Sequence, residues 1–68
     1  MKVELEENGK VLVLDDHYPI ELDRIPDERA LLQWIEHLGE KRWVDRDGIR
    51  KIIRTVFSAK GWELYKNI

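Results

Sequence analysis

The side chains that could carry hydrolytic chemistry are few in this chain. Ser58 and Thr55 are the hydroxyl candidates, and His17 and His37 are the two histidines. A nucleophile needs a base and an orienting group beside it. Both hydroxyls fall in a predicted helix, where hydroxyls usually face solvent or bond to the preceding turn. The carboxylates of Asp15–Asp16 are adjacent in an extended segment and would point to opposite faces. We therefore expect no enzymatic activity.

Metal-ligand residue types are also present, but their spacing matches no recognised site. The chain has no cysteine, which excludes disulfide bonds, thiol catalysis and cysteine-based zinc sites. Neither candidate group has the spacing of a His-Glu-x-x-His motif or of an EF-hand loop. We expect no metal and no cofactor. The two candidate groups are Asp15, Asp16 and His17, and Glu36, His37 and Glu40.

A stripe of arginines suggests nucleic-acid binding as an alternative function. Arg46, Arg50 and Arg54 recur every four residues on a predicted helix, with Lys51 beside them. Three observations oppose this interpretation. The preceding loop is longer than the turn of a helix-turn-helix motif. The sequence pI is about 5.6, unlike the basic footprint of nucleic-acid-binding domains. Asp45 and Asp47 would lie at the helix start, where phosphates would approach. Asp47 can also pair with Arg50 or Lys51 along the helix, which explains the stripe without a ligand. We expect a solvated helix face and no nucleic-acid partner.

Tryptophans give the leading hypothesis, which is protein binding. Ala30, Trp34 and His37 lie side by side on the first predicted helix. Trp is enriched at interface hot spots because it is large and rigid and carries one hydrogen-bond donor. Trp43 and Trp62 could extend the same patch, whereas all three tryptophans could equally belong to the core. The sequence thus favours a small protein-binding or accessory module whose partner is another protein or a second copy of the chain.

The elements that position these residues begin with a hairpin. Asn8–Gly9 is typical of a two-residue type I′ turn, in which both central residues take positive φ. This turn pairs Val3 with Leu14 and Leu5 with Leu12, and places these four side chains on one face. Because an isolated hairpin is marginal in water, this apolar face must be covered. The mixed opposite face offers a second contact surface, including edge-to-edge dimerisation.

Two helices should follow the hairpin. Asp27 and Asp45 are predicted N-caps, and Gly39 and Gly61 are predicted C-terminal stops. Residues 18–22 fit either a third, edge strand or a packed loop, because Pro19 restricts a strand to an edge or a strand start. The predicted class is α+β, with one domain over residues 1–68. The predicted core consists of Val3, Leu5, Leu12, Leu14, Leu31, Ile35, Leu38, Ile49, Ile53 and Val56.

Composition and charge limit the class of protein and its location in the cell. Hydrophobic residues make up 43% of the 68 residues, which is ordinary globular usage. The longest apolar run, Val11–Leu14, is too short to span a bilayer, and the first residues lack the apolar centre of a signal peptide. We expect a cytoplasmic protein without a membrane partner. Residues 1–29 carry nine acids and four bases, a charge of −5. A further alternative is therefore that residues 1–29 act as an acidic decoy and occupy the groove in which a partner protein binds nucleic acid.

The middle of the chain resembles short, uncharacterised proteins of bacteria and their phages. The resemblance covers about residues 27–57 and is carried by the Trp-x-x-His-Leu spacing at Trp34, His37 and Leu38, followed by Trp43-Val44. The quoted sequence is Leu31-Leu32-Gln33-Trp34-Ile35-Glu36-His37-Leu38, then Lys41, Trp43-Val44 and Ile49-Arg50-Lys51-Ile52-Ile53. Such proteins imply no particular activity. The resemblance favours a small accessory or host-directed role.

Overall fold

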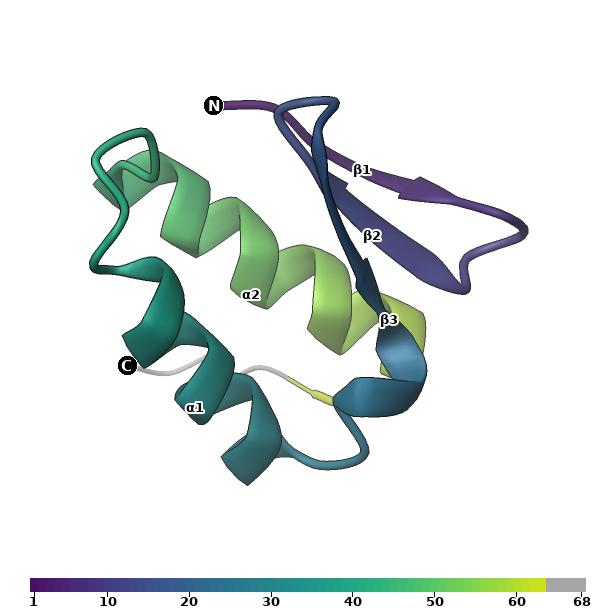
Figure 1. Ribbon diagram of the computed structural model, residues 1–68. Coiled ribbons are helices and arrows are strands. Elements are labelled where there is room, and N and C mark those ends of the chain that lie inside the picture. The colour runs from purple at the N-terminus through teal and green to yellow at the C-terminus, as the bar shows by residue number, and fades with distance from the viewer. Residues whose placement is uncertain (64–68) are drawn as a thin grey trace.

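A computed structural model describes residues 1–63 as a three-stranded sheet followed by two helices (Figure 1). This arrangement confirms the predicted α+β class. Both helices lie on one side of the sheet, so that one sheet face is covered. The elements are β1 (Val3–Glu6), β2 (Val11–Leu14), β3 (Tyr18–Glu21), the short 3₁₀ helix η1 (Leu22–Arg24), α1 (Glu28–Leu38) and α2 (Arg46–Lys60).

The sheet is an antiparallel meander in the order β1-β2-β3. Val3 pairs with Leu14 and Leu5 pairs with Leu12, which confirms the predicted register. The turn differs in detail. Asn8 and Gly9 have positive φ, as expected, but Glu7 also has a φ of 53°. A two-residue turn at Asn8–Gly9 would pair Glu7 with Lys10, but strand pairing stops at Glu6 and Val11, and Glu7 and Lys10 belong to the turn.

A second hairpin brings β3 to the edge of the sheet. Of the two alternatives for residues 18–22, an edge strand or a packed loop, the structure has the edge strand, over Tyr18–Glu21. Asp15 and Asp16 both have positive φ, and the backbone N–H of His17 donates to the Leu14 carbonyl. Aspartate is one of the few non-glycine residues that adopts this conformation readily. Pro19 lies in β3 opposite Val13. Because β3 is an edge strand, it tolerates a residue without a backbone N–H.

Both helices begin at the predicted caps. The Asp27 carboxylate accepts a hydrogen bond from the Ala30 backbone N–H at 2.8 Å, and the Asp45 carboxylate accepts one from Gly48 at 2.6 Å. These bonds satisfy backbone donors that have no partner within the helix. At the far end of α2, Gly61 adopts a φ of 73°, which a residue with a Cβ resists.

The core lies between the covered sheet face and the two helices. Three predicted members are half-buried and pack against the core, namely Val3, Ile35 and Ile49. Two other predicted members are corrected. Ile53 is only half-buried, because the neighbouring Ile52 points into the core instead, and Leu5 is 38% exposed near the tip of the hairpin. Ile20, Leu22 and Ile25 join the core from β3 and the segment after it. The buried set is Leu12, Leu14, Ile20, Leu22, Ile25, Leu31, Leu38, Ile52 and Val56.

Candidate functional site

A shallow groove separates α1 from the β3–η1 segment. It measures about 370 Å³ and opens widely to solvent. Three of the residues predicted as a protein interface, Ala30, Trp34 and His37, line it together. Their spacing along α1 repeats at about one helical turn, which places them on one side of the helix. The full lining of this α1 groove is Tyr18, Arg24, Ala30, Gln33, Trp34 and His37.

Two hydrogen bonds cross the α1 groove and hold its sides in place. The Trp34 indole N–H donates to the backbone carbonyl of Arg24 at 3.3 Å. The Tyr18 hydroxyl lies 3.4 Å from Nε2 of His37. One bond thus joins α1 to η1, and the other joins α1 to β3. The groove is consequently bounded by three elements whose relative positions are fixed by side chains of the groove itself.

Trp34 serves both the core and the groove surface. Its side chain is half-buried and packs against the hydrophobic cluster, while it also lines the α1 groove. The His37 ring stands edge-on to the indole, with 6.1 Å between the ring centroids. An aromatic ring held in this way offers apolar contact area with little conformational freedom to lose. Trp34 thus packs against the core and is also accessible in the groove, and its role in an interface stays a prediction.

The groove lining carries positive and neutral groups but no carboxylate among the residues that the structure describes. Arg24 is exposed, and its guanidinium forms no ion pair within residues 1–63. The Lys41 ammonium lies 5.3 Å from the centroid of the Tyr18 ring, within cation–π range. A second hollow, of about 300 Å³, shares Arg24 and Trp34 with the groove and contains two acids, Glu7 and Glu21.

The other two tryptophans occupy different places. Trp43 is half-buried and packs against His17 and Tyr18, with ring centroids 4.8 Å and 5.6 Å away. Trp43 therefore contacts Tyr18, a residue of the groove lining, but does not itself line the α1 groove. Trp62 stands edge-on to Phe57 at 5.4 Å, beyond the end of α2, and does not line the groove. Only Trp34 of the three therefore contributes directly to the candidate surface.

The arginine stripe lies on the outer surface of α2. Arg46, Arg50 and Arg54 are all exposed, as is Lys51. The predicted pairing of Asp47 with Arg50 or Lys51 is wrong, because within residues 1–63 no such ion pair forms. The Lys51 ammonium instead donates to the Met1 backbone carbonyl at 3.3 Å. The stripe is thus open to solvent, and its residues form no ion pair within residues 1–63.

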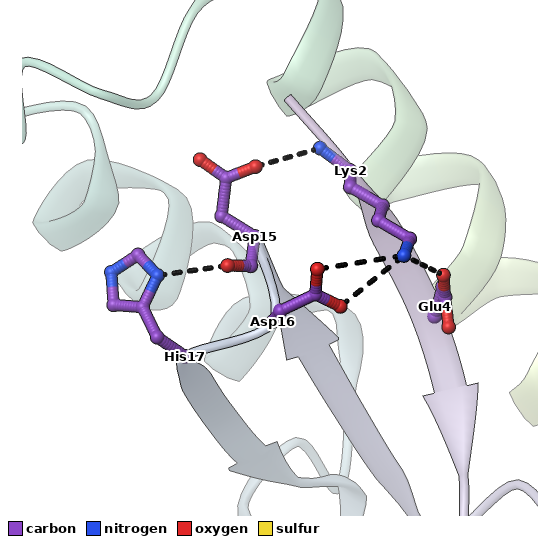
Figure 2. Close-up of polar contacts among 5 residues, drawn as sticks. All are labelled: Lys2, Glu4, Asp15, Asp16 and His17. Atoms are coloured by element: carbon purple, nitrogen blue, oxygen red, sulfur yellow. Dashed lines mark hydrogen bonds and ion pairs between the residues drawn. The ribbon is translucent and has the colours of Figure 1, made fainter.

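The predicted metal candidates do not converge. No group of three metal-ligand side chains comes together within the described residues. Figure 2 shows why the first set fails. The Asp16 carboxylate turns toward the Lys2 ammonium, at 3.3 Å, whereas Nδ1 of His17 lies on the other side of the turn, 3.0 Å from the Asp15 carbonyl. Lys2 also pairs with Glu4 at 2.9 Å, and the hydrogen bonds to these carboxylates, Glu4 foremost, raise the pKa of Lys2.

Sequence reasoning missed three residues of the groove, which are Tyr18, Arg24 and Gln33. Gln33 had a usable signal, because it lies three residues after Ala30 on α1 and so belongs to the same side of the helix. Tyr18 and Arg24 gave no such signal. Their positions opposite α1 depend on how β3 and η1 fold back, which is a tertiary property.

Comparison of the chain with protein-family models, with curated proteins and with solved structures found no match. The resemblance to bacterial and phage proteins therefore stays a prediction. Across residues 1–63, neither helix combines the length and the apolar character that crossing a bilayer requires.

Proposed function

We propose that the protein is a small, non-enzymatic protein-binding module whose α1 groove holds part of a partner protein. The observation that supports this most directly is the position of Trp34. Its half-buried ring is braced by a hydrogen bond to the Arg24 carbonyl and faces an open groove together with Ala30 and His37. Rigid, partly exposed aromatic rings of this kind commonly dominate binding energies at protein interfaces.

The shape of the groove favours a polypeptide over a small metabolite. A site for a small molecule usually encloses most of its ligand, whereas the α1 groove is wide open. A surface bounded by a helix and an edge strand instead suits the side chains of a partner chain. The resemblance over residues 27–57 adds the expectation of an accessory or host-directed role. The hydropathy of the chain separately favours the cytoplasm as the place where it acts.

The test uses a photo-reactive residue in place of Gln33, which is exposed and lines the groove. Irradiation in cells that produce the protein should give a specific covalent adduct with a partner. Ala30→Arg fills the groove and should abolish that adduct. Leu32→Arg is the matched control, because Leu32 is 66% exposed and lies outside the groove. Equal adduct yields from both variants, with both still folded, would disprove the proposal.

Nucleic-acid binding remains the second candidate function, and one observation favours it. The guanidinium groups of Arg46, Arg50 and Arg54 are exposed on α2 and form no ion pair within residues 1–63. Exposed, unpaired arginines along a helix can neutralise phosphates. The net charge of −2 opposes this function, and we rank it below protein binding.

A further inference from the structure

The charge of the α1 groove differs from that of the chain as a whole. The chain has 14 acidic and 12 basic residues, yet its groove lining includes Arg24 and no acid among the described residues. The Lys41 ammonium over the Tyr18 ring adds a second positive charge at the same wall. A partner segment in this groove would therefore meet the positive charge of Arg24 and no carboxylate of the lining, in a protein that is negative overall.

Two hydrogen-bonding groups of the lining have no partner within residues 1–63. The Trp34 N–H is already used by the Arg24 carbonyl, and the Tyr18 hydroxyl is beside His37. The Arg24 guanidinium and the Gln33 amide make no hydrogen bond to the described part of the chain. A guanidinium offers a planar set of donors that fits a carboxylate in a two-point contact.

The apolar part of the lining stands next to these donors. The Trp34 ring, the Tyr18 ring and the Ala30 methyl group provide surface for an aliphatic or aromatic side chain. The volume of about 370 Å³ is near the lower end of the range seen for ligand sites. It is sufficient for a short stretch of a partner chain.

The neighbouring hollow sets a direction along this surface. It shares Arg24 and Trp34 with the groove and is also lined by Glu7 and Glu21. An acidic side chain of a partner is repelled there and attracted by Arg24 in the α1 groove. The position of the partner's acid is thus defined by charge on both sides.

We propose that the α1 groove recognises a protein segment in which an aspartate or glutamate lies next to an aromatic or aliphatic residue. The carboxylate pairs with the Arg24 guanidinium, and the apolar side chain packs on Trp34. This inference rests on the proposed protein-binding function and adds the chemistry of the partner to it.

The test is selection of short random peptides on the full chain, followed by affinity measurements with the selected peptides. We expect enrichment of an acid beside an aromatic or aliphatic residue. Arg24→Gln should weaken binding about tenfold or more, because a hydrogen bond to a charged group contributes about 1.5–3 kcal/mol. Replacing the peptide's acid by its amide should have the same effect. Arg29→Gln is the control, because Arg29 is exposed on α1 but does not line the groove.

The outcomes separate the two proposals. Selected peptides that lose binding in Ala30→Arg, but show no acidic preference and no response to Arg24→Gln, would overturn this inference and leave the protein-binding function intact. If no selected peptide loses binding in the Ala30→Arg variant, both this inference and the protein-binding function are overturned. Sedimentation of the isolated protein should show a monomer. A dimer that Ala30→Arg dissociates would assign the groove to a second copy of the chain and also overturn the inference.

Discussion

Asp45 performs two tasks at the start of α2. Its carboxylate accepts the Gly48 backbone hydrogen bond at 2.6 Å and lies 3.6 Å from the amino group of Met1. The Gly48 bond is the main cause of the lowered pKa of Asp45, and the Met1 ammonium adds to it. A Cβ at Gly48 would lie 2.5 Å from the Met1 sulfur, so a larger residue there would require the Met1 side chain to move. The Asp45 carboxylate thus links Met1, which precedes β1, to the first turn of α2.

Asp45→Asn should lower the stability of the protein in a pH-dependent way. Asparagine can still cap the helix, so the variant removes mainly the charge. Because the pKa of Asp45 is lowered from 3.8 on folding, the carboxylate stabilises the fold at pH values above 3.8. This contribution is lost as the pH falls through the lowered folded-state pKa. Chemical unfolding at a series of pH values should show a difference from the wild type at neutral pH that shrinks on acidification.

Asp47→Asn is the control for this prediction. Asp47 is exposed in the same helical turn and has no ion pair within residues 1–63. Its replacement should change stability little at any pH. A destabilisation by Asp45→Asn that stays constant across the pH range would show that the charge of Asp45 is not what stabilises the fold.

At the scale of the element, the apolar stripe of α2 is so wide that the sequence does not define how the helix is rotated about its axis. Several rotations would bury part of the stripe in the core. Ile49, Ile52, Ile53, Val56 and Phe57 all fit helical spacing, and neighbouring residues differ by about 100° around the helix. The structure turns Ile52 and Val56 fully inward and leaves Ile53 at the border. The sheet and α1 determine this rotation, because they decide which part of the stripe meets the core.

Ile52→Ala and Ile53→Ala form a matched pair that tests this rotation. Ile52 is 1% exposed, so its truncation should cost about 2–5 kcal/mol of unfolding free energy. That is a large share of the stability of so small a domain. Ile53→Ala should cost no more than about 1 kcal/mol. Both values come from denaturant unfolding of the two variants. A larger loss of unfolding free energy for Ile53→Ala than for Ile52→Ala would mean that the Ile53 side of α2 faces the core.

At the scale of the whole molecule, charge is distributed unevenly along the sequence. Residues 1–29 have a charge of −5, and residues 30–68, with five acids and eight bases, have +3. The exposed arginines of α2 belong to the positive part, as does Lys41 beside the α1 groove. The groove and the stripe are different surfaces, since none of the four stripe residues lines the groove.

The arginine stripe should not bind nucleic acid. We expect no change in the fluorescence anisotropy of labelled DNA or RNA when the protein is added, even at low salt. The nearby acids Asp45 and Asp47 and the negative net charge oppose phosphate approach. Salt-sensitive binding that is lost when Arg46, Arg50 and Arg54 are replaced together by alanine would contradict this. Each arginine that contacts a phosphate would then lower the salt slope by about 1.

By itself, the sequence determined the features that depend on near neighbours. The Asn8–Gly9 turn and period-2 alternation set the β1–β2 register, and Asp27 and Asp45 marked the helix starts. The helical spacing of Ala30, Trp34 and His37 likewise placed them on one side of α1. These features follow from backbone periodicity and from hydrogen bonds that span only a few residues.

Only the tertiary structure decided what stands opposite those residues. The positive-φ turn at Asp15–Asp16 returns β3 to the sheet, and that return brings Tyr18 and Arg24 across from α1. The choice of Ile52 over Ile53 has the same origin. A single helix or hairpin has the same local geometry whichever way it is rotated, so the contacts between elements are set when all of them bury their apolar faces against one another.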